Sequence, residues 1–318
     1  MKNLFTGVLI TGCILSALEA SACSFNCKTD LTVPETAIQL SMDSKFKPTH
    51  STFYKKDGYI GPSIEQNNVA FKNSVMTGTI DGEVVYRFQN KFGYNAAKKH
   101  DIENALNYSL GRSEFKLKDS SAFKPGQKFT VKYDFYVPKE IKFSGNRTLY
   151  VGQFKNHKAG KIVWGIQKAS AKNAVGYFEG RWRSSPFTDK EVKPHDLVFS
   201  YRGILGHNGN DSMEHITLAR AEEWQGKWHT VEYTSDTKDN GSFKFVFNGK
   251  TIIDCTNCDT FYNAKEFYEE WANKNHKKDA MMFQWGTYQF AHNPSTLKKE
   301  EIVDAITYYK NIKIQVDK

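Results

Sequence analysis

The sequence predicts an all-β fold, a two-sheet antiparallel sandwich or jelly roll with a few short helices. Short runs rich in β-branched and aromatic residues recur along the chain, as expected of many short strands. Asn248-Gly249 separates two such runs, which is a strong hairpin signal. No Pro/Ser/Gly-rich linker, repeat or low-complexity tract interrupts the pattern, so we expect one large β domain.

The expected strands follow one another closely along the chain. They comprise residues 69–71, 83–88, 115–117, 128–137, 149–154, 161–166, 174–183, 197–201, 229–233, 243–247, 251–254, 281–288 and 305–316. Residues 237–241 are predicted to form a second turn, in addition to Asn248-Gly249. Helical spacing of apolar residues occurs over 263–275, and a short helix is predicted over 297–302.

The first 22 residues resemble a secretory signal peptide. Lys2 precedes a mostly apolar stretch over residues 4–18, and Ala20-Ser21-Ala22 is a small-residue cleavage site. We therefore expect a signal peptide over 1–22, an N-terminal arm over 23–64 and the β domain over 65–318. The predicted location is secreted or periplasmic, with no transmembrane segment. A lipid anchor at Cys23 is the alternative, because this cysteine directly follows the cleavage site.

Four cysteines remain once the signal peptide is removed, namely Cys23, Cys27, Cys255 and Cys258. Their spacing would also suit a zinc site, but export into an oxidising compartment favours disulfides. The sequence does not choose among the possible pairings. We expect no metal and no cofactor. Calcium is an alternative, although no acidic loop has the spacing of calcium ligands.

The formal net charge of +9 favours a polyanionic partner. No helix-turn-helix, zinc-finger or RNA-binding motif is present, so we do not expect nucleic acid to be that partner. Export favours an acidic polysaccharide, and we expect the chain to act as a monomer.

Three strand-like runs carry polar, reactive side chains at alternate positions. Residues two apart share one face of a strand. Arg112, Glu114, Lys116 and Lys118 therefore project together, as do Gln153 with Lys155 and Gln284 with Tyr288. An ordinary antiparallel sheet would place such groups in solvent. A guanidinium, a carboxamide and a phenol on three runs are better explained by a polar groove across a sheet.

Four segments resemble motifs of the jelly-roll polysaccharide lyases, the group that contains alginate lyases, glucuronan lyases and heparin lyase I. Residues 112–115 (R-S-E-F) resemble the R-x-E-L strand, and residues 153–155 (Q-F-K) stand where the group carries Q-x-H. Trp228-His229, leading to Asn248-Gly249-Lys250, is similar to a hairpin of the group. Residues 283–288 (F-Q-W-G-T-Y) are similar to F-K-x-G-x-Y. The resemblance extends over about residues 65–316 and implies a concanavalin-like jelly roll.

The resemblance also implies β-elimination on a uronic-acid polysaccharide. Gln153 and Arg112 match the positions that neutralise the substrate carboxylate and stabilise the enolate-like intermediate. Tyr288 matches the tyrosine that protonates the leaving oxygen and in some members also removes the C5 proton. We expect the surrounding Arg and Lys side chains to lower the pKa of Tyr288.

The sequence departs from the motifs at two positions, since Lys155 replaces the histidine of Q-x-H and Gln284 replaces the lysine of F-K-x-G-x-Y. The base is therefore open. The candidates are His157, His100, Lys155 with a lowered pKa, and Tyr288 acting as both base and acid. Loss of activity, leaving a sugar-binding protein, is a further alternative.

Further side chains are candidates for substrate binding. Arg181 and Arg183 alternate with Trp182, which predicts either a subsite for a charged sugar or a solvated edge strand. Lys116 and Gln284 belong to the polar runs, and Glu114 is expected to orient Arg112 through an ion pair.

Two other functions compete with a lyase. A sandwich-fold glycoside hydrolase would present two carboxylates in E-x-D-x-x-E spacing, which this sequence lacks. A lectin-like module would keep the basic and aromatic face without needing Tyr288. New ultraviolet absorbance from an unsaturated uronate product would distinguish a lyase from both.

Overall fold

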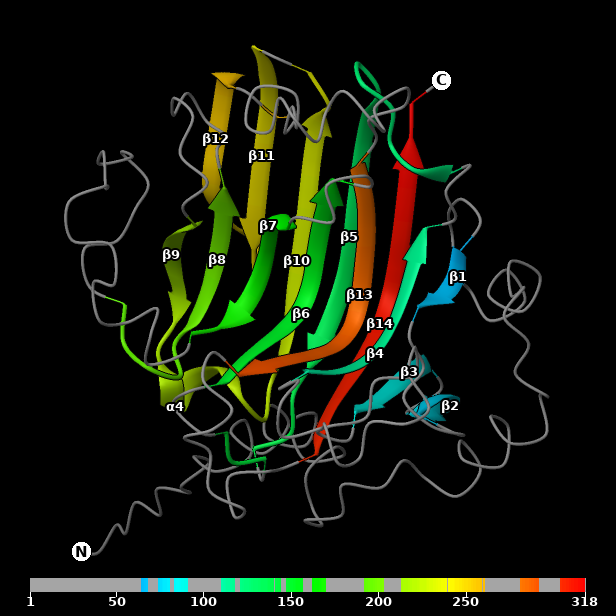
Figure 1. Cartoon of the computed structure of the whole chain (residues 1–318), viewed down its shortest axis with the longest axis vertical. Helices are drawn as coiled ribbons and strands as arrows, with labels where there is room; N and C mark the ends of the chain where they lie inside the picture. The colour runs from blue at the N-terminus through cyan, green and yellow to red at the C-terminus, as the bar shows by residue number, and fades with distance from the viewer. Residues whose placement is uncertain are drawn as a thin grey trace, which may run out of the picture. The chain divides into compact units, whose positions relative to one another are not determined.

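Two antiparallel sheets of seven strands form the described part of the chain (Figure 1). The computed structural model describes residues 64–67, 74–80, 83–90, 110–117, 121–139, 141–143, 147–156, 162–169, 192–202, 213–238, 240–258, 260, 281–291 and 304–317. All of them lie within one compact unit that covers residues 32–318. The predicted two-sheet antiparallel sandwich is thereby confirmed.

The front sheet, nearer the viewer in Figure 1, carries the three polar runs. Its strand order is β1 (Ile64–Asn67), β4 (Leu110–Leu117), β13 (Met281–Ala291), β6 (Arg147–Asn156), β7 (Ile162–Lys168), β8 (Leu197–Arg202) and β9 (Met213–Ala219). Strand β13 comes late in the sequence, but in the sheet it lies between the early strands β4 and β6. This non-local order is what brings separate sequence motifs together.

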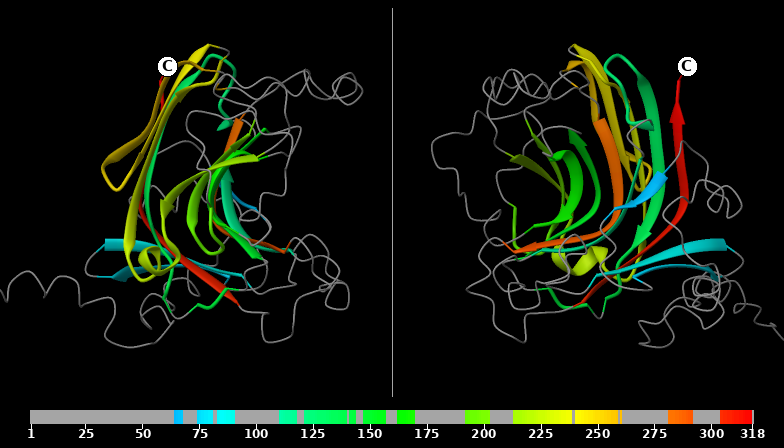
Figure 2. Two further views of the ribbon diagram at one scale, coloured as in Figure 1. Left: turned by 90° about the vertical axis from the view of Figure 1, so that its left-hand side faces the viewer. Right: turned by 45° about the vertical axis from the view of Figure 1, so that its right-hand side comes forward.

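The back sheet lies behind the front sheet, as the turned views show (Figure 2). Its order is β12 (Lys250–Cys258), β11 (Gly241–Phe247), β10 (Trp228–Asp236), β5 (Lys128–Tyr136), β14 (Ala305–Val316), β3 (Glu83–Asn90) and β2 (Val75–Ile80). The short helix α4 (Ala221–Trp224) precedes β10. Strand β10 alternates strictly between buried and half-buried residues, the pattern of a sheet with one covered face.

Aromatic side chains fill the space between the sheets. Rings of the front sheet meet rings of the back sheet at centroid distances of 4.4 Å for Phe199–Phe245, 5.1 Å for Phe154–Tyr233, 4.9 Å for Phe115–Phe88 and 5.7 Å for Phe283–Tyr133. Such offset and edge contacts add to the burial of apolar area. Because Phe115, Phe154 and Phe283 point inward, their sequence neighbours on β4, β6 and β13 point to the outer face of the front sheet.

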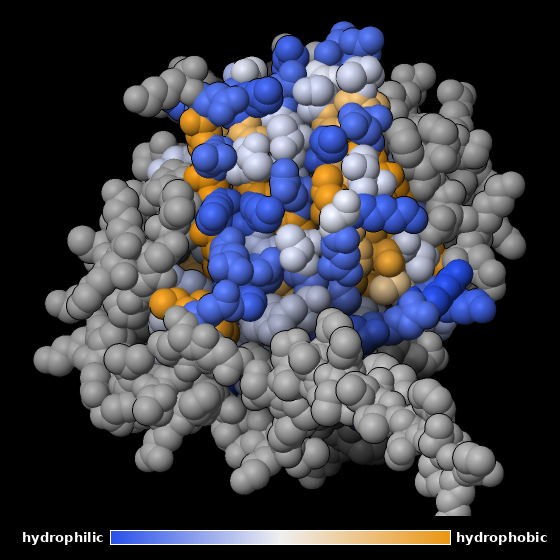
Figure 3. Space-filling model, turned by 180° about the vertical axis from the view of Figure 1, so that it is seen from behind, coloured by the Kyte–Doolittle hydropathy of each residue, from blue (hydrophilic) through white to orange (hydrophobic). Residues whose placement is uncertain are grey.

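The two sheets differ on their outer faces. The outer face of the back sheet is largely hydrophilic and exposed (Figure 3), with surface ion pairs Lys132–Glu232 and Lys244–Asp254, each at 3.5 Å. Pairs of this kind contribute little to stability. The outer face of the front sheet instead carries polar side chains that are buried, including Glu114, Gln153 and Gln284. A buried polar face on an outer surface needs a specific explanation.

The hairpin prediction is confirmed. Asn248 and Gly249 connect β11 to β12 with φ of 50° and 76°, the left-handed values that a type I′ turn requires at both positions. The strands β1, β2 and β9 and the four-residue helix α4 were not expected. β1 is rich in polar residues and β2 contains a central glycine, so neither has a strong strand pattern. The expected strands at 69–71 and 174–183 and the expected helices at 263–275 and 297–302 lie outside the described residues.

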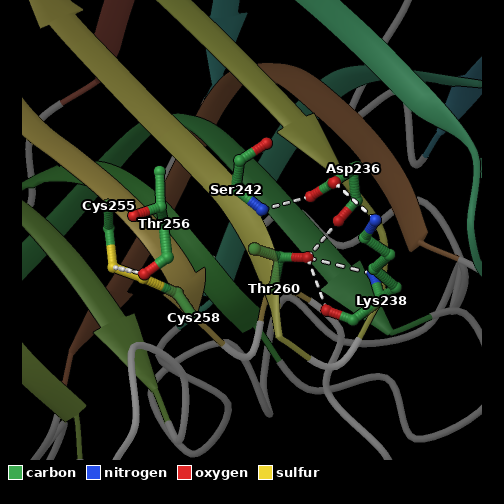
Figure 4. Close-up of a disulfide and its surroundings, with 7 residues drawn as sticks. All are labelled: Asp236, Lys238, Ser242, Cys255, Thr256, Cys258 and Thr260. Carbon is green, nitrogen blue, oxygen red and sulfur yellow. Dashed lines mark hydrogen bonds and ion pairs between the residues drawn. A yellow bond between two sulfur atoms is a disulfide. The ribbon is translucent and has the colours of Figure 1, made fainter.

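Cys255 and Cys258 form a disulfide within the edge strand β12, with their Cα atoms 6.1 Å apart (Figure 4). The strand is irregular there, since Asn257 has φ of 60°. A turn network lies beside the bridge, in which Asp236 pairs with Lys238 at 3.1 Å and the Thr260 hydroxyl donates to the backbone of Lys238 at 2.8 Å. Cys255 and Cys258 are therefore disulfide-bonded rather than zinc ligands. Cys23 and Cys27 lie outside the described residues.

No helix in the described segments is long and apolar enough to cross a membrane. Within the same segments, no group of three or more His, Cys, Asp or Glu side chains is arranged to hold a metal ion.

Candidate active site

The three polar runs lie on neighbouring strands, with β13 between β4 and β6. Along one lateral row, Gln284 lies between Lys116 on β4 and Gln153 on β6. Along a second row, Tyr288 lies between Arg112 on β4 and Tyr150 on β6. The strand pairing therefore brings the predicted residues of all three runs together on the outer face of the front sheet.

Gln153 is at the centre of the cluster and is completely buried. Its Nε2 donates to Glu114 Oε1 at 2.5 Å and to Gln284 Oε1 at 3.2 Å. Its Oε1 accepts no hydrogen bond from any residue that the structure describes. The carboxamide is therefore held from two sides, while its oxygen remains an unsatisfied acceptor in a buried position, where such an atom costs about 1–3 kcal/mol.

Gly286 explains how Glu114 on β4 reaches Gln153 on β6 across the intervening strand. Gly286 is the direct partner of Glu114 in the sheet, and it has no side chain to obstruct the contact. Its φ of +129° and the backbone oxygen of Ser113, 2.4 Å from the position of a Cβ, leave room for no other residue. A Cβ would also lie 2.9 Å from the side chain of Phe88 in the core, so close packing requires a glycine at this position of the 283–288 segment.

Arg112 and Tyr288 form the second half of the cluster. The Arg112 guanidinium lies over the Tyr288 ring, with Cζ 4.2 Å from the ring centroid, and its Nε is 3.8 Å from Glu114 Oε2. Tyr288 also stacks on Tyr150 at 5.5 Å and an interplanar angle of 18°. Lys155 Nζ lies 5.6 Å from the same Tyr288 centroid. One phenol is therefore in contact with two cations and a second phenol ring.

A family model described as "Polysaccharide lyase" matches residues 47–313, which is most of the chain. The chain belongs to the polysaccharide lyase family. Among solved structures, it is similar to an endo-β-1,4-glucuronan lyase from the fungus Trichoderma reesei, with 13% identity, coverage of 79% of this chain and 86% of the other, and a TM-score of 0.44. An alginate lyase from Alteromonas sp. 272 shows 13% identity, coverage of 73% and 87%, and a TM-score of 0.42. No curated protein sequence matches this lyase.

The expectation that nearby cations lower the pKa of Tyr288 was wrong. Burial raises the pKa of the Tyr288 phenol above its ordinary value, and the opposing effect of Arg112 offsets only part of the rise. Desolvation penalises the phenolate more than the guanidinium stabilises it. In the lyase, Tyr288 is therefore held as a neutral phenol, which suits a proton donor better than a base.

The pKa of Lys155 shifts in the opposite direction, downward. Burial, and secondarily the charge of Arg112, lowers the pKa of the Lys155 ammonium to about 8, although Glu114 opposes the change. A lysine with this pKa is partly neutral near physiological pH and can accept a proton. Of the candidate bases named from the sequence, Lys155 and Tyr288 lie within the described residues, and Lys155 is the one of these two whose pKa is lowered.

Glu114 is buried between the two halves of the cluster. Burial raises the pKa of its carboxyl group, with Arg112, Lys155 and Gln153 acting against the rise. For Arg112, burial alone would lower the guanidinium pKa, but Glu114 and Tyr288 outweigh it and the pKa is raised. Glu114 therefore contacts both Arg112 and Gln153, an arrangement that fits a positioning role.

Not every predicted residue can be placed. His157, His100, Lys118, Arg181 and Arg183 lie outside the described residues. Tyr150 was missed by the sequence reasoning. It is three residues from Gln153, so simple alternation assigns it to the inner face. A register shift between Tyr150 and Gly152 adds the extra residue that turns it outward, and the sequence carries no signal of that irregularity.

Gln153→Ala should lower kcat by about 10² with a smaller change in KM. The carboxamide would stabilise charge that develops on the substrate carboxylate in the transition state, so its loss is felt mainly in the chemical step. Steady-state kinetics on the best polymer would measure both constants. A change confined to KM would show that Gln153 is a ground-state binding contact and would place the stabiliser elsewhere.

Proposed function

We propose that this lyase is an exported enzyme that cleaves a uronic-acid polysaccharide by β-elimination. The observation that carries the proposal is the cluster of Arg112, Gln153, Lys155 and Tyr288 on one face of the front sheet. Eliminating a glycosidic oxygen requires an acidic proton on the adjacent carbon, and a carboxylate attached to that carbon supplies the acidity. A guanidinium and a carboxamide beside a proton acceptor and a proton donor match that requirement.

The substrate carboxylate would bind between Arg112 and Gln153. Both N–H groups of Gln153 are already engaged, so an incoming carboxylate replaces the weaker acceptor, Gln284 Oε1, while Glu114 continues to hold the other N–H. Arg112 supplies the charge and Gln153 supplies a directed hydrogen bond. Together they stabilise the negative charge that spreads from C5 onto the carboxylate.

Lys155 and Tyr288 would carry the two proton transfers. Neutral Lys155 removes the proton from C5. The electron pair of the broken C5–H bond then becomes the second bond between C4 and C5. The bond from C4 to the glycosidic oxygen breaks, and the Tyr288 phenol donates its proton to that oxygen. The products are a new chain end bearing a hydroxyl group and an unsaturated uronate. The lowered pKa of Lys155 and the raised pKa of Tyr288 support this assignment. At a pH between these two pKa values, Lys155 is neutral and Tyr288 keeps its proton.

Ultraviolet absorbance of the unsaturated product tests the proposed function. The chain should be incubated with alginate, glucuronan, heparin, heparan sulfate and hyaluronan, with a neutral glucan as control. We expect absorbance to grow with at least one uronate polymer and not with the glucan. New reducing ends without absorbance would indicate a hydrolase, and binding without either signal would indicate a lectin-like module.

A further inference from the structure

A second polar cluster lies on the front sheet outside the candidate active site. It consists of Gln167 on β7, Ser200 on β8 and His215 on β9. Gln167 Nε2 donates to Ser200 Oγ at 2.5 Å, and Ser200 Oγ lies 2.7 Å from His215 Nδ1. All three side chains are buried, with exposed fractions of 0%, 0% and 7%. A buried polar chain of this kind across three strands is not required by a sandwich core.

The strand register places this cluster on the same face as Gln153. Gln153 pairs with Gly165, Gly165 with Ser200, and Ser200 with His215, which forms one lateral row across β6, β7, β8 and β9. Gln167 pairs with Tyr150, the ring that stacks on Tyr288. Phe199, which precedes Ser200 on β8, points inward against Phe245 of the back sheet, so Ser200 points to the outer face. The cluster is therefore a lateral continuation of the active-site face.

Gly165 leaves no side chain between the two groups of polar residues. A Cβ at this position would lie 2.7 Å from the backbone oxygen of Gly152, so the close approach of β6 requires a glycine. Strands lie about 4.8 Å apart, so Ser200 is roughly 10 Å from Gln153 across the sheet. A polysaccharide that binds at Gln153 and continues across the strands would pass directly over Gly165 toward Ser200.

The hydrogen bonds of the cluster fix which ligand chemistry it can recognise. Gln167 can donate only through its Nε2, so Ser200 Oγ accepts from it, and Ser200 Oγ and His215 Nδ1 share a second hydrogen bond. Gln167 Oε1 has no hydrogen-bond partner among the described residues, although the side chain is fully buried. An unpartnered buried acceptor calls for an external donor. The cluster combines an amide, a hydroxyl and an imidazole rather than carboxylates or guanidinium groups, which suits a sugar hydroxyl rather than a sugar carboxylate.

We propose that Gln167, Ser200 and His215 form a subsite for a hydroxyl-bearing sugar unit of the same polysaccharide chain, displaced along the sheet from the cleaved bond. The identity of that chain as a uronate polymer rests on the proposed function. The subsite itself rests on the register, the hydrogen-bond directions and the unpartnered Gln167 oxygen. It makes cleavage dependent on chain length, because a short oligosaccharide held at Gln153 and Tyr288 does not reach Ser200.

Ser200→Ala tests the subsite through kinetics on oligosaccharides of increasing length from the polymer that the wild type cleaves. Removing the hydroxyl breaks both hydrogen bonds in the cluster and releases the Gln167 amide. We expect KM for the longest oligosaccharides to rise about tenfold with kcat nearly unchanged, and the kinetics on the shortest cleavable ones to stay at wild-type values. Ser235→Ala is the matched control, because Ser235 is an equally buried serine on the interior side of β10 in the back sheet. It should leave kinetics unchanged for every length.

Equal losses on short and long oligosaccharides would overturn the subsite and assign the cluster a structural role, which a matching fall in Tm would corroborate. Unchanged kinetics at every length would overturn it as well. Calorimetric titration with short and long oligosaccharides of the five uronate polymers separates this proposal from the proposed function, because it measures binding without cleavage. Weaker binding of long chains by Ser200→Ala would support the subsite even if no polymer gave unsaturated product, whereas wild-type protein that binds none of them would overturn the subsite and the proposed substrate together.

Discussion

Tyr288→Phe should lower kcat by about 10³ on the best uronate polymer while the protein folds normally. The substitution removes one hydroxyl group and keeps the ring that stacks on Tyr150 and lies beneath the Arg112 guanidinium. Without the phenol, the leaving oxygen must depart as an unprotonated alkoxide or take its proton from water, and both routes are slower. General acid catalysis by a positioned side chain typically contributes 10²–10⁴-fold, so a loss of this size is expected.

The readouts are the growth of product absorbance and the thermal midpoint. Tyr233→Phe is a suitable control, since it removes a buried phenol hydroxyl on the interior side of β10, far from the outer face. That variant should keep wild-type kinetics. If Tyr288→Phe retains more than about a tenth of wild-type kcat, another group protonates the leaving oxygen and the assignment of Tyr288 fails.

The sequence predicted the fold because the local signals were strong. Inward aromatic or β-branched residues alternate with more exposed, mostly polar ones along β5 and β11, and the Asn248-Gly249 turn requires backbone angles that few residue pairs tolerate. Alternation also predicted that Arg112 and Glu114 share a face, as do Gln153 and Lys155. These are relations within one strand, which a period of two residues determines.

Relations between strands could not be obtained in the same way. The contact from Glu114 to Gln153 depends on the pairing of Glu114 with Gly286, and the outward position of Tyr150 depends on an irregularity in β6. The row from Gln153 to His215 crosses four consecutive strands and depends on the register of each neighbouring pair. Such contacts depend on the register between strands, which the residue pattern within a single strand does not determine.

The pKa of Tyr288 shows why the electrostatics of the site were misjudged. Counting neighbouring charges predicts a lowered value, because Arg112 and Lys155 both favour the phenolate. Burial acts in the other direction and is the larger effect, so the pKa rises. The same burial acts on Lys155 and makes its neutral form accessible, with a pKa of about 8. Desolvation depends on the packed structure and is invisible in a list of charges.

These two opposite shifts predict the pH dependence of the reaction. A base acts when it has lost its proton, so kcat/KM should rise with pH through about 8, where Lys155 becomes neutral. The acid acts while it keeps its proton, and the raised pKa of Tyr288 preserves that state well into the alkaline range. We therefore expect a single rise followed by a broad plateau. At pH 7, roughly a tenth of Lys155 would be neutral, so activity there should be about a tenth of the plateau value.

Lys155→Arg separates the basicity of this residue from its charge. Arginine keeps the cation but does not lose its proton in this pH range, so kcat should fall by about 10³ and the rise near pH 8 should disappear, while KM changes little. His157→Ala provides the comparison, because an imidazole base would give a rise near its ordinary pKa of about 6.5. If Lys155→Arg keeps the wild-type profile and His157→Ala loses activity, the proton is removed by the histidine. In that event Lys155 serves only to bind the substrate anion, and the lowered pKa reflects its burial beside Arg112 without a catalytic purpose.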